Sequence, residues 1–484
     1  MTGKPLARWT FSPEFAIAVL LLLRVILLLI GPGILSGDGF LYLGAAQHVA
    51  QTGMAPPASV QSRSFSVLLA PLLHLLGQDA VWNPMPSDAA VTGNPVADAV
   101  HWLQVLFDLV VVWALLRVYL RVRPANIWAF RAGYAVIALQ PITAAWTNMV
   151  LPDTLAMFGF FLGMVLLARS VDGGIGRWAQ PVGGLLLGLA GFLRIDLAPL
   201  AAMIFGLWLL AQFWQRGRLA LAGALGATAL FVMPAAAMMT FQYASQGDAR
   251  YIVFDAPDNP GVARAGYFAW VRAWMMTQSE FRSYAFDVGT AGWRGFDIAG
   301  YPARAFTDPS QHDLAAGALA DWRAKGYGPS VDARFQRVAD ALRAAKPLQR
   351  WVTAPGARTA QLWVNPDGGA AINFAFDLKP PRSWIVAAAV AFLKLLLGAL
   401  ALWGSIVVLR SGWRAPDRTA ALSLYPVGLA VLSLVALLGR AAEMWLLNIA
   451  VSSAVMESRY VIEVWPCTIV LAMFGFRALA DRAR

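Results

Sequence analysis

Apolar blocks about twenty residues long recur along this chain of 484 residues. A helix of about 20 apolar residues is what crosses the roughly 30 Å of hydrocarbon in a bilayer. The composition agrees, because 59% of the residues are hydrophobic and 13% are charged, whereas soluble domains are about 45–50% apolar and about 25% charged. The chain is therefore expected to be an all-α polytopic membrane protein.

The apolar pattern predicts about ten spans. Basic clusters beside several of them indicate the cytoplasmic side of a plasma (inner) membrane, and they place both termini on that side. Two shorter segments, Phe40–Gly53 and Ser64–Leu76, are expected to be interfacial helices. The ten expected spans are Phe15–Ile34, Val100–Val122, Ile127–Met149, Asp153–Arg169, Val182–Arg194, Leu197–Trp214, Leu219–Phe241, Ser383–Leu409, Thr419–Gly439 and Tyr460–Phe476.

Residues 242–382 contain no run long enough to span, and they mix charges with Trp, Gly and Pro. Long loops are translocated largely regardless of their charge. We therefore expect one extracytoplasmic insertion at 242–382 between a transmembrane core at 1–241 and a C-terminal transmembrane segment at 383–484.

Several classes of site are made improbable by composition. The single cysteine, Cys467, excludes intrachain disulfides and cysteine-based metal clusters. The four histidines show no ligand spacing, so zinc is not expected, although a divalent metal held by carboxylates stays open. The net charge of +11 is attributed to membrane topology and anionic lipid, and not to nucleic acid.

Charged motifs gather at one predicted membrane depth. Asp38 directly follows the first apolar run, at the boundary between lipid and water. On the predicted topology four other motifs share this outer face. They are Pro152–Asp153, Arg194–Asp196, Arg440 and Glu457–Tyr460. The sequence therefore predicts a site between the outer leaflet and the insertion.

The ordered set of motifs resembles the GT-C glycosyltransferases, in the branch of protein O-mannosyltransferases and bacterial lipid A aminoarabinose transferases. The opening motif Asp38-Gly-Phe-Leu-Tyr42 continues through Pro56-Pro57 to the run 64–77. Leu151-Pro152-Asp153 resembles the second acidic motif, Gly184 to Arg194 the fifth span, and Arg459-Tyr460 the entry into a late span. The segment 242–382 departs from the family pattern.

The resemblance implies an inverting transfer of a hexose or pentose from a polyprenyl-phosphate donor to a lipid, glycan or protein acceptor. Asp38 would be the general base, and Asp153 would orient the acceptor, bind a metal or act on Asp38 as a like charge. Guanidinium groups match phosphate oxygens, so Arg459, and less directly Arg440 and Arg63, would hold the phosphate. Further substrate contacts are assigned to Tyr42, Tyr460 and His48.

Other interpretations stay open at this point. Asp38 also suits a helix N-cap, Asp153 suits a helix start, and Arg459 could extend to the interface from a span end. Tyr42 and Tyr460 also suit an interfacial aromatic belt, and Arg194 and Asp196 favour a structural role. Ten spans would equally fit a transporter or flippase, or a ligase or polymerase that uses a lipid pyrophosphate.

Two charges, Arg24 and Asp108, are predicted inside the membrane at similar depth, about 15 Å from the outer ends of their spans by helical rise. Intramembrane charges are usually paired or functional. The sequence therefore predicts an ion pair that joins the first two spans. Lys394 lies at similar depth and has no partner evident in the sequence.

Overall fold

The structure is a computed structural model that describes most of the chain. The described residues are 19, 21–26, 31, 33–35, 38–55, 63–77, 91–144, 146–171, 178–216, 221–247, 264–285, 288–289, 293–365, 380–414, 425–450 and 458–482. Within these ranges the regular secondary structure is helical apart from one two-stranded antiparallel sheet of β1 (Ile34–Leu35) and β2 (Val91–Thr92).

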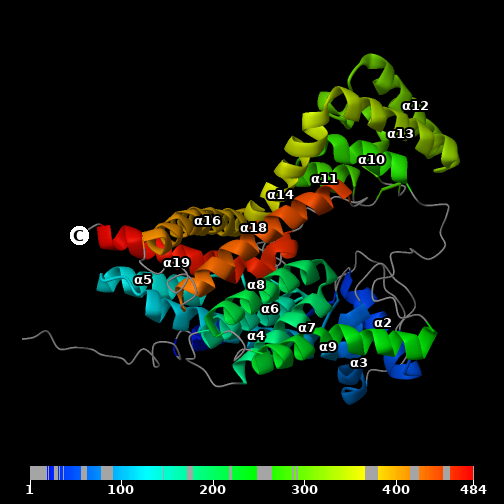
Figure 1. Ribbon diagram of the computed structural model, residues 1–484. Helices are drawn as coiled ribbons and strands as arrows, with labels where there is room; N and C mark the ends of the chain where they lie inside the picture. The colour runs from blue at the N-terminus through cyan, green and yellow to red at the C-terminus, as the bar shows by residue number, and fades with distance from the viewer. Residues whose placement is uncertain are drawn as a thin grey trace, which may run out of the picture.

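The helices outside residues 264–365 make up the larger part of the molecule (Figure 1). They are α2 (Asp38–Thr52), α3 (Arg63–Leu75), α4 (Pro95–Val122), α5 (Ile127–Leu139), α6 (Asp153–Val171), α7 (Ala179–Leu193), α8 (Ala198–Arg216), α9 (Leu221–Gln246), α16 (Arg382–Arg414), α18 (Val427–Ala450) and α19 (Trp465–Arg482). Two 3-10 segments, η1 (Ile195–Leu197) and η7 (Ser458–Val464), precede α8 and α19.

Seven helices of the described chain are long and apolar enough to cross a membrane, so the chain is a helical membrane protein. These helical segments are Pro95–Val122, Asp153–Val171, Ile195–Gln215, Leu221–Gln246, Arg382–Ser411, Val427–Ile449 and Tyr460–Arg482. Each corresponds to one of the ten predicted spans. The first predicted span lies mostly outside the described residues, although 21–26 are helical.

Two predicted spans correspond to apolar helices that are shorter than the about 20 residues needed to cross a membrane. The predicted span Ile127–Met149 contains only α5, which ends at Leu139 because Gln140 is followed by Pro141, and a residue before proline is disfavoured in the α region. The Gln140 side chain then accepts hydrogen bonds from the backbone of Ile142 and Thr143. The predicted span Val182–Arg194 is the 15-residue helix α7, and Arg194 has an extended backbone.

The ninth predicted span has wrong boundaries. It was expected to end at Gly439, whereas α18 continues to Ala450. Arg440 therefore lies in the middle of a membrane-type helix and not at its end. The reason is local charge compensation, because Arg440 contacts carboxylates of α18 and of neighbouring elements and need not reach water.

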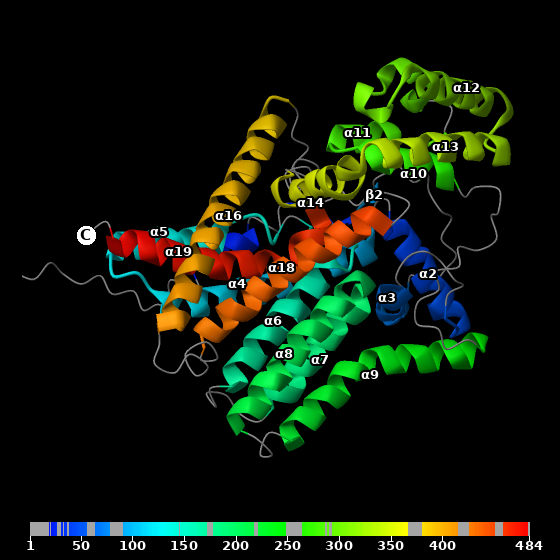
Figure 2. The ribbon, with the colours of Figure 1, turned by 45° about the horizontal axis from the view of Figure 1, so that its top comes forward.

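Glycines bring α7 very close to α9. A Cβ atom added at Gly184 or Gly188 would overlap the carbonyl oxygens of Ala227 and Phe231 in α9. Small residues four apart allow such close backbone packing between membrane helices. Figure 2 shows α6, α7 and α8 side by side with α9 beyond α7.

Residues 264–365 form a second helical unit, which projects from the larger part in both ribbon views and joins it through its last helix, packed against α18 (Figures 1 and 2). Its core is a buried aromatic cluster around Tyr267, Trp270, Trp274 and Phe335. The Trp270 indole donates to Ala305 O at 2.8 Å. The elements are α10 (Ala265–Trp274), α11 (Gln278–Tyr284), η3 (Arg294–Phe296), η4 (Ile298–Gly300), η5 (Ala303–Ala305), α12 (Pro309–Lys325), α13 (Pro329–Ala345), the π-helical turn η6 (Gln349–Thr353) and α14 (Ala354–Val364).

Candidate functional site

The starts of α2 and α6 are held at one corner of the molecule by backbone pairing. Ile34 N donates to Asn148 O at 2.6 Å, and Val150 N donates to Ile34 O at 3.2 Å. Helix α2 begins at Asp38, three residues after β1, and α6 begins at Asp153, three residues after Val150. The two acidic helix starts, 115 positions apart in the sequence, are therefore brought to the same corner.

Two side chains of α4 contact the backbone of the segment that precedes Asp153. Gln104 Nε2 donates to the carbonyl oxygens of Met149 and Leu151, both at 3.0 Å. His101 Nδ1 lies 2.9 Å from Thr147 O. These contacts satisfy backbone carbonyls of a segment that is not helical. They therefore fix the conformation of the backbone that precedes Asp153.

Asp153 and Asp38 have different surroundings. Asp153 is 1% exposed, and its carboxylate accepts a hydrogen bond from Arg194 Nη1. Asp38 is only half-buried and occupies the first turn of α2. Of the two predicted catalytic carboxylates, Asp38 is thus the one with solvent-accessible surface, whereas Asp153 is enclosed with its guanidinium partner.

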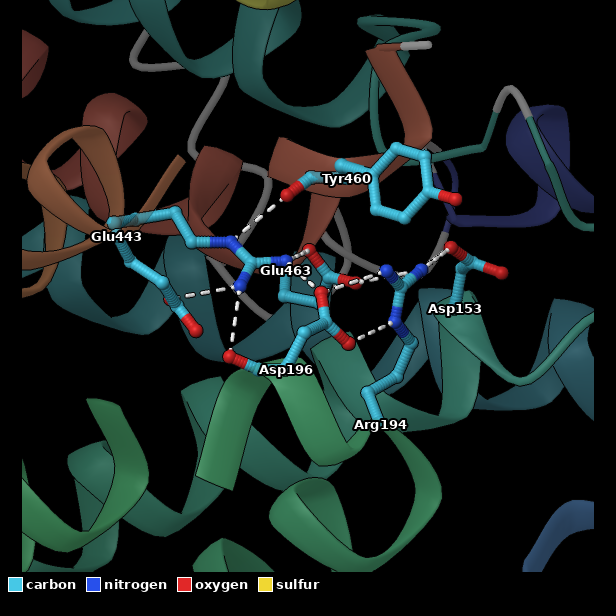
Figure 3. A network of polar contacts seen from close by, with 7 residues as sticks. Asp153, Arg194, Asp196, Glu443, Tyr460 and Glu463 are labelled. Carbon is cyan, nitrogen blue, oxygen red and sulfur yellow. Dashed lines mark hydrogen bonds and ion pairs between the residues drawn. The ribbon is translucent and has the colours of Figure 1, made fainter. Parts of the chain in front are cut away.

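Arg194 lies at the centre of a buried network of ion pairs (Figure 3). Besides Asp153, its guanidinium donates to Asp196 Oδ1 at 3.0 Å and Oδ2 at 2.8 Å. Glu463 Oε1 lies 3.3 Å from Arg194 Nη1. The extended backbone at Arg194 and the 3-10 turn after it place Arg194 and Asp196 on one side, where they form this bidentate pair.

Arg440 completes the network from α18. It donates to Tyr460 O at 2.8 Å, to Glu443 Oε2 at 2.8 Å and to Asp196 Oδ2 at 2.7 Å. Arg440 is fully buried, and all three of its side-chain nitrogens have partners. This geometry corrects the predicted phosphate contact, because Arg440 has neither an exposed surface nor an unused fork to offer a lipid phosphate.

Glu443 and Glu463 are the network residues that the sequence analysis missed. With them, four carboxylates surround two guanidiniums, the other two being Asp153 and Asp196. Glu463 is fully buried, and neither of its carboxylate oxygens has a hydrogen bond. A signal was present in the sequence, since Glu463 interrupts the apolar run Val461-Ile462-Glu463-Val464, and an isolated charge in such a run is usually paired or functional.

The other predicted substrate contacts are dispersed. The Tyr460 ring lies 4.8 Å from the Arg194 guanidinium, so Tyr460 belongs to the network. Tyr42 is buried and packs edge-on against Phe65 at 5.3 Å between ring centroids, which makes it a link between α2 and α3. His48 lies ten residues after Asp38 in α2, or about 15 Å of helical rise, so it is not beside the predicted base. The side chains of Arg63 and Arg459 lie outside the described part of the structure.

The predicted intramembrane ion pair is present. Arg24 Nε donates to Asp108 Oδ2 at 2.6 Å, and Arg24 Nη2 donates to Asp108 Oδ1 at 3.1 Å. Lys394, which had no evident partner in the sequence, donates to Asn365 O at 2.6 Å. Within the described ranges, no group of three or more His, Cys, Asp or Glu side chains is arranged to hold a metal ion.

The arrangement can therefore offer a partly exposed carboxylate beside a rigid, charge-paired support. Comparisons with known proteins add no family to this picture: no protein-family model, no curated protein and no solved structure matches the chain.

Proposed function

We propose that this protein is a membrane glycosyltransferase that moves a sugar from a polyprenyl-phosphate donor to an acceptor hydroxyl or amine on the extracytoplasmic face. Asp38 is the general base. The observation that supports this proposal most directly is the corner where backbone pairing holds the Asp38 helix start against the segment that leads to Asp153. Such a reaction requires a positioned carboxylate that the acceptor can reach, and Asp38 is half-buried at a helix start held by backbone pairing.

In the proposed reaction, Asp38 accepts the proton of the acceptor as the acceptor atom attacks the anomeric carbon. The bond between this carbon and the phosphate oxygen breaks, and polyprenyl monophosphate leaves with the electron pair. Direct displacement inverts the anomeric centre. A phosphate monoester is a competent leaving group, so the residues have to position the acceptor, remove its proton and neutralise the developing phosphate charge.

The network residues are assigned to support and not to proton transfer. Asp153, buried and paired with Arg194, is a positioning residue that anchors α6 beside the Asp38 corner. Arg440 ties α18 to η1 and η7. Arg459 and Arg63 remain the proposed phosphate contacts, on the basis of their sequence positions.

The test is an assay of the purified protein with a panel of polyprenyl-phosphate sugars and membrane-extract acceptors. The parent protein should release free polyprenyl monophosphate, and Asp38→Asn should lower kcat about 10²–10⁴-fold with little change in donor KM. Asp313→Asn is the matched control, because the Asp313 side chain is 83% exposed in the second helical unit.

Three results would contradict the proposal at different levels. Unchanged kcat in Asp38→Asn would remove Asp38 as the base. Turnover of polyprenyl-pyrophosphate sugars alone, with release of polyprenyl pyrophosphate, would identify a ligase or polymerase, and donor movement across vesicles without any released phosphate would identify a transporter or flippase.

A further inference from the structure

Four arginines of the second helical unit gather at the C-terminal end of α18. They come from α10, α13, η6 and α14, and we call them the arginine cluster: Arg272, Arg343, Arg350 and Arg358. Arg272 Nη1 and Arg350 Nη2 each donate to Ile449 O at 3.3 Å. Arg358 Nη2 donates to Asn448 O at 2.9 Å. The last carbonyls of a helix lack helical partners and carry partial negative charge, which accounts for part of this clustering.

The hydrogen bonds to these carbonyls do not use all of the N–H donors of the arginine cluster. Arg350 is 3% exposed, and its Nε and Nη1 atoms are buried without a hydrogen-bond partner. The Nε atom of Arg343 is also buried without a partner, although its Nη1 donates to Asp340 at 3.0 Å. A buried donor without an acceptor is costly, and it is more costly when it carries charge.

The arginines also repel one another. Burial, with Arg272 and Arg343 nearby, lowers the pKa of Arg350 to about 10. Burial, with Arg350 and Arg272 nearby, lowers the pKa of Arg358 to about 9. Among the described residues, neither Arg350 nor Arg358 has a carboxylate within ion-pair distance. A helix end supplies about half a negative charge, which is less than the two positive charges of Arg350 and Arg358.

We propose that the arginine cluster is a phosphate-binding site, in which Arg350 and Arg343 hold the phosphate with their unused donors. Guanidinium groups match phosphate oxygens in geometry and charge. Arg343 is one-third exposed and provides the approach from solvent. The site is separate from the ion-pair network, because Ile449 lies nine residues beyond Arg440 in α18, or about 14 Å of helical rise. The binding does not depend on the proposed glycosyl transfer.

Two sources of phosphate are compatible with these residues. The neighbouring side chains Leu348, Trp351 and Val352 are exposed at 65%, 48% and 42%, and the Trp351 ring lies 5.0 Å from the Arg350 guanidinium. Apolar side chains beside a cationic site suit the chain and headgroup of a lipid. A soluble phosphate or phosphate ester would use the same donors without these contacts.

The test measures binding to the full-length protein in neutral maltoside micelles. One arm follows the thermal midpoint in inorganic phosphate against chloride at equal ionic strength, since a ligand of the folded state stabilises it in a saturable manner. The other arm counts bound phosphatidic acid by native mass spectrometry, with diacylglycerol as the lipid that lacks only the phosphate. Arg343→Gln and Arg350→Gln should each weaken binding about tenfold or more.

The controls separate this site from general charge and from misfolding. Arg337→Gln removes an exposed arginine of the same helix, α13, and should bind like the parent. Arg343→Gln keeps the Ile449 contacts intact, so it serves even where Arg350→Gln lowers stability. Binding in the first arm alone indicates a soluble ligand, and in the second alone a lipid. Absence of saturable binding in both arms, or binding that survives both variants, overturns the proposal.

Discussion

The Arg24–Asp108 pair gives the most direct test of how this protein tolerates charge in its apolar part. Arg24 is 3% exposed and Asp108 is fully buried. Among the described residues, Arg24 supplies both hydrogen bonds to the Asp108 carboxylate. Removing one partner of a buried pair leaves an uncompensated charge and typically costs about 3–5 kcal/mol. We expect Arg24→Met to lower the free energy of unfolding by an amount in this range.

Removing Asp108 should destabilise the protein less than removing Arg24, because the Arg24 guanidinium has other hydrogen-bond acceptors. It also donates to Ala138 O at 3.0 Å, Gln140 O at 2.6 Å and Thr143 Oγ1 at 2.8 Å. In Asp108→Leu these three oxygens still bind the guanidinium. We expect a loss of about 2–3 kcal/mol, near the low end for a broken buried pair. The double variant should lose less than the two single losses combined, because no carboxylate is then left without a partner.

The assay is reversible unfolding of the parent, the two single variants and the double variant in mixed micelles, followed by circular dichroism. The four free energies form a double-mutant cycle. A coupling energy below about 0.5 kcal/mol, which is the range for independent sites, would refute the conclusion that the two charges stabilise one another. Arg24→Met that unfolds like the parent would refute the assignment of Arg24 as the compensating charge.

Three further predictions concern other parts of the structure. Arg440→Leu should destabilise the protein by about 3–5 kcal/mol in the same unfolding assay, and Arg440→Lys should rescue it only in part because the ammonium lacks the fork geometry; an unfolding curve like the parent's would contradict the structural role. Gly188→Ala places a methyl group against Phe231 O and should cost about 1–3 kcal/mol by overpacking, whereas Gly226→Ala, at an open position of α9, should not. Hydrogen bonds from Ser310, Thr307 and the backbone of Gln311 lower the pKa of Asp308, so its cap stabilises α12 above the unfolded-state pKa of about 3.9; the difference in thermal midpoint between the parent and Asp308→Ala should therefore be full near pH 6 and vanish as the pH falls through the lower folded-state pKa, and a difference that grows on acidification would contradict the cap.

The helical membrane class could be predicted because hydrophobic length is a local property. Seven predicted spans correspond to helices of adequate length and hydropathy. The apolar runs did not predict the end of α18, because Arg440 resembles a span boundary in the sequence. Its charge is compensated by Glu443, three residues later in α18, and by tertiary contacts with Asp196 and Glu463. For α5 the reverse holds: Pro141 was a local stop signal inside an apolar run, and it determined where the helix ends.

The pairing of Arg24 with Asp108 was predictable from their equal depth, although Lys394 lies at similar depth and binds Asn365 O instead. The ion-pair network was only partly predictable. Its members include Asp153, Arg194, Arg440 and Glu463. These residues are far apart in the sequence, and no regular spacing predicts that they meet. Glu463 in particular looked like part of the last span, and its role depends on which helix faces it.

The contrast between Asp38 and Asp153 shows what the structure adds to the functional question. In the sequence both are acidic residues at a helix start beside an apolar run, and the sequence analysis assigns the base to Asp38 and an orienting, metal-binding or electrostatic role to Asp153. A general base must exchange its proton with the acceptor and then with solvent, so it needs an accessible oxygen. Arg194 holds Asp153 in a charge-paired and enclosed position, whereas Asp38 keeps exposed surface. Because the segment that leads to Asp153 pairs with the strand that leads to Asp38, the network can still govern where Asp38 points. Substitution of Arg194 should therefore alter catalysis through position, and substitution of Asp38 through proton transfer.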